Sequence, residues 1–152
     1  MIFNIILLSL GLILLCIITI YDFKYLVIPN IYVGILTIIG IIYQFFRGEL
    51  LEGIIGGSIY ILPLLFIYGY VSDIFQRECL GFGDVKLMFA IGIFLSFKSM
   101  NHIFIFYNVI FFLCGIFTIF FYKKYKDKYI IPFGPILSVG GIIFYICQEK
   151  YF

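Results

Sequence analysis

The chain has 152 residues, of which 64% are hydrophobic and 12% charged, and its mean hydropathy is +1.21. Soluble domains carry about 25% charged residues, so this composition excludes an ordinary soluble domain and predicts a polytopic, all-α membrane protein. The net charge of +2 is too small to indicate a nucleic-acid partner. The length allows one compact membrane-embedded domain, which we place at residues 1–152.

Six apolar segments have the length, or nearly the length, of a helix that crosses a bilayer, which takes roughly 20 residues. The predicted helices are 2–21, 31–46, 53–72, 84–98, 100–122 and 129–148. Pro29 suits the first turn of the second helix. We expect the fourth helix to begin in or just after the glycine loop that contains Gly81 and Gly83.

Basic residues are distributed unequally between the two ends of this predicted bundle. One side carries seven of them: Lys24, Arg77, Lys86, Lys123, Lys124, Lys126 and Lys128. The opposite side carries three: Arg47, Lys98 and Lys150. Because cytoplasmic loops hold the excess of Lys and Arg, we expect the first side to face the cytoplasm. Asp22 and Asp84 both fall on that side.

These two acids lie at the edges of apolar runs. Asp22 closes a run with no other charge from Met1 onward, and Asp84 stands at the mouth of another run. A carboxylate there is costly unless it is paired or hydrated, so it indicates a functional site. Two close carboxylates share a proton, which lets one activate water while the other donates to a peptide bond. The pattern predicts an acid/base pair.

The surroundings of Asp84 suit this chemistry. The N-terminus of its predicted helix favours an anion by about 0.3–1 kcal/mol, and we expect Lys86 to add to this effect. Asp84 is therefore expected to hold the charge and Asp22 the proton. Gly81 and Gly83 let an extended substrate backbone approach closely. Taken alone, the two glycines are better explained as a flexible loop that enters the helix.

Three motifs then occur in an order typical of one family. Gly81-Phe82-Gly83-Asp84 matches the GxGD signature of membrane aspartic proteases, with Lys86 two residues on. Asp22 followed by Ile28-Pro29-Asn30 resembles the first-aspartate motif of type IV prepilin peptidases. Ile131-Pro132-Phe133-Gly134-Pro135-Ile136 resembles the IPFGP segment of a late helix in those enzymes. The chain as a whole resembles the type IV prepilin peptidase family.

The resemblance implies an aspartic endopeptidase whose catalytic residues are Asp22 and Asp84. Such enzymes remove the basic leader of prepilin-like proteins at the cytoplasmic face of the inner membrane, after a glycine and before the substrate's hydrophobic helix. The implied partners are these substrates and the lipid bilayer, and no metal or organic cofactor is expected. The implied supporting or substrate-binding residues are Pro29, Asn30, Gly81, Gly83, Lys86, Pro132, Gly134 and Pro135. A kinked helix start explains the last three equally well.

The chain departs from larger family members, which carry an N-terminal segment with cysteine pairs and methylate the new N-terminus. Here the sequence begins in an apolar helix and its four cysteines lie far apart, so we expect a peptidase-only form without N-methyltransferase activity. Asn30 also replaces the more frequent Asp of that motif. The one histidine, His102, leaves little material for a metal site. Oligomeric state, and a role in pili, secretion, motility or DNA uptake, stay open.

Three alternatives remain at this stage. A presenilin-like or signal-peptide-peptidase-like protease also pairs an acid with GxGD, although such proteins have more spans and a late PAL motif. A small transporter could use Asp22 and Asp84 as a proton or cation site, and an inactive scaffold subunit could retain both. Asp73 is the only rival catalytic acid, and no motif flanks it.

Overall fold

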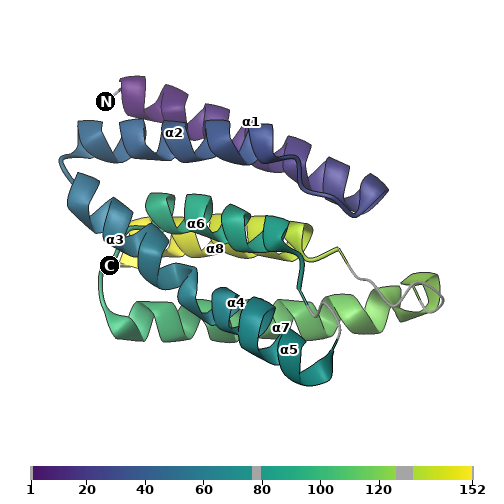
Figure 1. The fold of residues 1–152 in the computed structure, drawn as a ribbon. Coiled ribbons are helices and arrows are strands. Elements are labelled where there is room, and N and C mark those ends of the chain that lie inside the picture. Colours follow the sequence, from purple (N-terminus) through teal and green to yellow (C-terminus); the bar gives the residue numbers. More distant parts are fainter. Residues whose placement is uncertain (1, 77–79, 126–131, 152) are drawn as a thin grey trace.

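The computed structural model describes residues 2–76, 80–125 and 132–151, and every regular element in these ranges is a helix. The helices run lengthwise beside one another as a bundle (Figure 1). In chain order they are α1 (Ile2–Tyr25), α2 (Asn30–Arg47), α3 (Leu50–Tyr60), α4 (Leu62–Phe66), a π-helical turn (Ile67–Val71), α5 (Ser72–Phe75), α6 (Phe82–Leu95), α7 (Met100–Tyr125) and α8 (Gly134–Tyr151). The expected all-α class is confirmed.

Four helical stretches are long and apolar enough to cross a membrane: Ile2–Tyr25, Asn30–Arg47, Leu50–Phe75 and Met100–Phe120. α8 contains a shorter apolar stretch, Gly134–Gln148. The third pass was predicted as one helix over 53–72, but it is longer and is broken by Pro63 and the π-helical turn. The last helix begins at Gly134, later than predicted, and residues 129–131 lie outside the described part of the chain.

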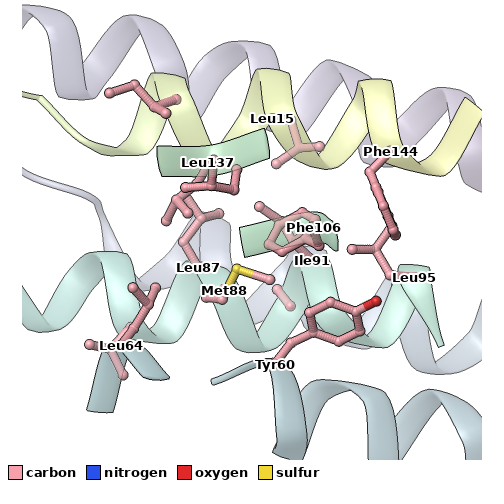
Figure 2. Packing of buried hydrophobic residues seen from close by; sticks show 14 of the residues in the cluster. Leu15, Tyr60, Leu64, Leu87, Met88, Ile91, Leu95, Phe106, Leu137 and Phe144 are labelled. Atoms are coloured by element: carbon pink, nitrogen blue, oxygen red, sulfur yellow. The ribbon is translucent and has the colours of Figure 1, made fainter. Parts of the chain in front are cut away.

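α6 is the central helix of the bundle. Its side chains Leu87, Met88 and Ile91 are buried, and Figure 2 shows them among apolar residues of the neighbouring helices. Glycines bring α3 and α6 into backbone contact, because a Cβ built on Gly56 would lie 2.6 Å from the carbonyl oxygen of Gly92. Small residues at such interfaces let membrane helices approach closely. The position of α6, and of the acid at its start, is therefore fixed by packing.

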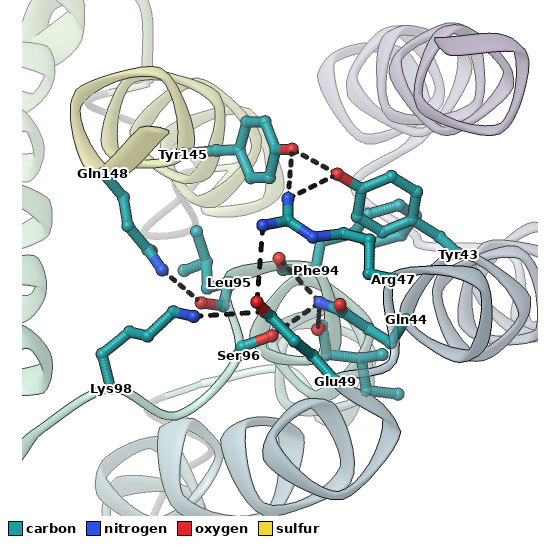
Figure 3. Close-up of polar contacts among 11 residues, drawn as sticks. Tyr43, Gln44, Arg47, Glu49, Phe94, Leu95, Ser96, Lys98, Tyr145 and Gln148 are labelled. Atoms are coloured by element: carbon teal, nitrogen blue, oxygen red, sulfur yellow. Dashed lines mark hydrogen bonds and ion pairs between the residues drawn. The ribbon is translucent and has the colours of Figure 1, made fainter. Parts of the chain in front are cut away.

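A polar cluster around Gln44 lies at the C-terminal end of α6 (Figure 3). The side-chain amide of Gln44 donates hydrogen bonds to the carbonyls of Ile93 and Phe94, at 2.7 and 3.1 Å, and to Ser96 Oγ at 2.7 Å. These bonds satisfy carbonyls that the last turn of a helix leaves without partners. α6 consequently has 14 residues, about 21 Å, and stops at Leu95 instead of the predicted 98.

Candidate active site

Asp22 lies in the last turn of α1 and is buried, with 5% of its surface exposed. Its carboxylate oxygen Oδ2 accepts a hydrogen bond of 3.0 Å from the backbone N–H of Gly134, the first residue of α8. The first N–H groups of a helix lack partners within the helix and favour an anion. Residues 112 positions apart in the sequence thus meet at one carboxylate.

The chain turns sharply just after Asp22. The N–H of Leu26 donates to the carbonyl of Asp22 at 2.9 Å, and Leu26 adopts a positive φ of 55°. This left-handed residue ends α1 and directs the chain towards Pro29, which directly precedes α2. Pro29 was predicted in the first turn of α2, and it occupies the capping position one residue earlier.

Asp84 is the third residue of α6 and is also buried. Its backbone N–H donates to the carbonyl of Gly81 at 3.1 Å, so the glycine loop forms the start of the helix as predicted. Its side-chain oxygen Oδ1 has no hydrogen-bond partner among the described residues. Asp84 is also close enough to Asp22 for their charges to interact. The last turn of α1 and the first turns of α6 and α8 lie towards the same end of the bundle (Figure 1).

Three glycines near the acids are so close to neighbouring atoms that a side chain in their place would have little or no room. A Cβ built on Gly134 would lie 2.8 Å from Asp22 Oδ2, and one on Gly81 would lie 3.2 Å from Asp84 Oδ2. A Cβ on Gly83 would lie 3.0 Å from the Cβ of Ile28. Close approach of side chains and backbone therefore accounts for these glycines.

Ile28 is the residue that sequence reasoning missed. It is buried, and it lies against both Gly83 in the first turn of α6 and Gly134 at the start of α8. It thereby packs between the helix that carries Asp84 and the start of α8, whose first N–H binds Asp22. The sequence did contain a signal, because Ile28 is the first residue of the motif that follows Asp22, but that motif was used only for recognition.

Lys86 contacts Asn30 and Phe82 at the start of α6. Its ammonium donates a 3.0 Å hydrogen bond to Asn30 Oδ1 and lies 4.6 Å from the centroid of the Phe82 ring. The bond is exposed to solvent and connects the first residue of α2 with the first turns of α6. The described contacts of Lys86 are therefore with the neighbouring motif residue Asn30, at the edge of the site.

The remaining predicted residues are less directly connected to the acids. Pro132 and Pro135 are buried on either side of Gly134, and the carbonyl between them, of Phe133, accepts the N–H groups of the first turn of α8. The prolines thus belong to the helix start that presents Gly134.

Asp73, the rival acid, is exposed on α5. Among the described residues, no group of three or more His, Cys, Asp or Glu side chains could hold a metal ion.

The described contacts thus bring two buried carboxylates, a helix N-terminus and a glycine loop together at one end of a membrane-type bundle. A family model, the type IV leader peptidase family, matches residues 9–122, which is well over half of the chain and includes both acids. The chain belongs to the type IV leader peptidase family. Comparisons with curated proteins and with solved structures found no match.

Membership of this family confirms the resemblance predicted from the motifs, and it makes a peptidase the favoured interpretation over a transporter. The segment that contains Gly134 lies beyond the matched range of this leader peptidase chain. Its contact with Asp22 is therefore an observation of the structure that does not depend on the match.

Proposed function

We propose that this chain is an aspartic endopeptidase that removes the basic leader of type IV prepilin-like proteins, with Asp22 and Asp84 as its catalytic pair. The observation that carries the proposal is the unequal environment of two neighbouring buried carboxylates. Asp22 accepts a backbone hydrogen bond from Gly134, whereas Asp84 Oδ1 has no partner among the described residues. Pairs of acids whose environments differ in this way divide the roles of acid and base.

The contacts support the opposite division of charge from the one expected from the sequence. The N–H of Gly134 and the N-terminus of α8 stabilise the ionised form of Asp22. Asp84 also lies in a first helical turn, but it is buried near Asp22, and two such neighbours resist ionising together. Asp22 is then the general base and Asp84 the general acid.

With these roles the hydrolysis proceeds in two steps. Asp22 takes a proton from water as the water oxygen bonds to the scissile carbonyl carbon, and Asp84 gives its proton to the carbonyl oxygen. The resulting tetrahedral diol collapses when the C–N bond breaks: Asp22 returns its proton to the leaving nitrogen, and Asp84 takes back a proton from one diol hydroxyl as the C=O bond of the new carboxyl group forms. Asp22 is then ionised and Asp84 protonated, as at the start.

The distribution of basic residues supports a cytoplasmic position for this end of the bundle in the inner membrane. The substrate's leader would lie in water, its hydrophobic helix in lipid, and the cleaved bond after a glycine at the level of the two acids. The backbone at Gly81 and Gly83 would move to admit it, as active-site segments commonly do.

The test is cleavage of a purified prepilin-like protein by the full chain in liposomes. We expect one product whose new N-terminus, read by mass spectrometry, follows the glycine that precedes the hydrophobic segment. A matched substrate in which that glycine is replaced by valine should remain intact. Absence of cleavage of a substrate that another leader peptidase processes would contradict the proposal, and proton or cation flux instead would favour the transporter.

A further inference from the structure

We propose that a groove between α1 and α7 receives the apolar side chains that follow the cleaved bond of the substrate. The groove has a volume of about 260 Å³ and almost wholly apolar walls. α1 and α7 both pack against α8, which forms its floor through Pro135 and Val139. The inference rests on the proposed function and assigns a substrate-binding surface to it.

The position of the groove relative to Asp22 supports this assignment. Thr19 and Phe23 of α1 line it, and they stand three residues before and one residue after Asp22 in the same helix. Pro135, also in the lining, directly follows Gly134, whose N–H binds the carboxylate of Asp22. The groove therefore begins within one helical turn of Asp22 on α1 and one residue from Gly134 on α8.

Its direction also fits a membrane-inserted substrate. From the level of Asp22, the lining continues along α8 from Pro135 to Val139 and along α7 from Phe120 back to Leu113, roughly 10 Å of helix. Along both helices, the lining residues therefore run from the end of the bundle that carries the acids towards the middle of the bundle. A substrate cut at its membrane-surface end must place its next, apolar residues along this path.

The size of the groove favours a few side chains as its occupant. Pockets for whole small molecules begin at about 300 Å³, so 260 Å³ cannot enclose a helix. The rings of Phe23 and Phe117 are 5.9 Å apart, and both line the groove. We therefore expect the first one or two large apolar residues after the cleaved bond to bind here.

Two other grooves are less suitable. The larger one, of about 330 Å³, is lined by Leu8 and Leu12 of α1 and Tyr145 of α8, which lie far along those helices from Asp22. The other, of about 300 Å³, has the Lys86 ammonium and the Asn30 amide in its wall and is less apolar. Of these three, only the groove between α1 and α7 is both apolar and lined by direct chain neighbours of Asp22 and Gly134.

The experiment places a large side chain in the groove and compares substrates that have large or small side chains after the cleaved bond. Val139→Trp fills the floor, and Ile143→Trp is the control because Ile143 lies one turn further on α8, outside the groove, with similar exposure (47% and 43%). Each full-length variant in liposomes receives two prepilin-like substrates, with leucine or alanine at the first two positions after the cleaved bond.

We expect Val139→Trp to reduce kcat/KM for the leucine substrate at least about tenfold and to leave the alanine substrate near the wild-type value. Ile143→Trp should match wild type on both. Equal rates of Val139→Trp and wild type on both substrates would overturn the proposal, and so would an equal loss on both, which would indicate a lipid or structural role. Failure of wild type on both substrates would instead refute the proposed function.

If Val139→Trp does not fold, the same comparison uses the opposite wall. Ile116→Trp on α7 narrows the groove, and Ile119→Trp, which is 78% exposed and outside it, is the control. The same selective loss on the leucine substrate is expected for Ile116→Trp. A loss that does not depend on the substrate would overturn the assignment.

Discussion

Replacing Gly134 by alanine tests the contact that defines the site. The added methyl would lie 2.8 Å from Asp22 Oδ2 and 3.2 Å from the Cδ1 of Ile28, so either the carboxylate or the start of α8 must move. The 3.0 Å bond from the Gly134 N–H to Asp22 is then lengthened or lost. A hydrogen bond to a charged group contributes about 1.5–3 kcal/mol, which corresponds to roughly a ten- to hundredfold lower kcat.

The assay is single-turnover cleavage of a prepilin-like substrate by purified protein, with thermal unfolding measured on the same samples. Gly141→Ala on the same helix is the matched control, because its methyl would lie 2.8 Å from Ile91 Cγ2, in the core and away from the acids. It should lower stability but leave the kcat of the folded protein unchanged. Gly115→Ala, whose new methyl meets no other part of the protein within 4 Å, should leave kcat unchanged and should not lower stability, because alanine favours a helix over glycine.

A Gly134→Ala variant that cleaves at the wild-type rate would refute this reasoning, since it would show that the bond to Asp22 does not contribute to catalysis. A loss of activity in Gly134→Ala that is matched by Gly141→Ala would also refute it, because both losses would then follow from packing alone.

Three further predictions concern the surroundings of the acids and the far end of α6. Ile28→Ala should lower kcat at least about tenfold and the free energy of unfolding by about 2–5 kcal/mol, measured by cleavage and by denaturation. The reason is that buried Ile28 packs against Gly83, which precedes Asp84, and against Gly134, which binds Asp22; an unchanged kcat would contradict this. Gln44→Ala removes buried hydrogen bonds and should lower the free energy of unfolding by about 1–3 kcal/mol while kcat/KM is retained. The control Ser58→Ala loses only an exposed hydrogen bond and should lower it by almost nothing. Equal melting temperatures of the two variants would contradict this prediction. Asn30→Asp turns the exposed bond to Lys86 into an ion pair worth less than about 1 kcal/mol, so kcat/KM should stay within about threefold, and a larger change would give Asn30 a greater role.

Much of the helical framework could be predicted from the sequence because apolar segment length is a strong signal in a membrane protein. The start of α6 in the glycine loop was also predicted, from the same residues that form the GxGD motif. Its end was not, because the helix stops where the side chain of Gln44, 49 residues earlier in the chain than Ile93, binds its last carbonyls. A hydropathy pattern gives no information about such a contact between residues that are distant in the sequence.

The candidate acids were also predicted, because an isolated carboxylate is conspicuous in an apolar chain. Their individual environments were not. The sequence suggested a helix N-terminus only for Asp84, whereas Asp22 receives the N–H of Gly134 from α8. A side chain at the C-terminal end of one helix can meet the N-terminus of another only through the tertiary fold. The charge assignment proposed above depends on that contact, whereas the one predicted from the sequence could not include it.

The proposed catalytic pair is tested most directly by comparing wild type with Asp22→Asn and Asp84→Asn in the leader-cleavage assay. Asp73→Asn, which changes the exposed acid on α5, is the control. Asparagine keeps the size of each side chain but can neither take nor give the proton. We predict that wild type and Asp73→Asn cleave at similar rates and that each of the other two variants, folded and membrane-inserted, yields no product. Full cleavage by Asp22→Asn or Asp84→Asn would contradict the account.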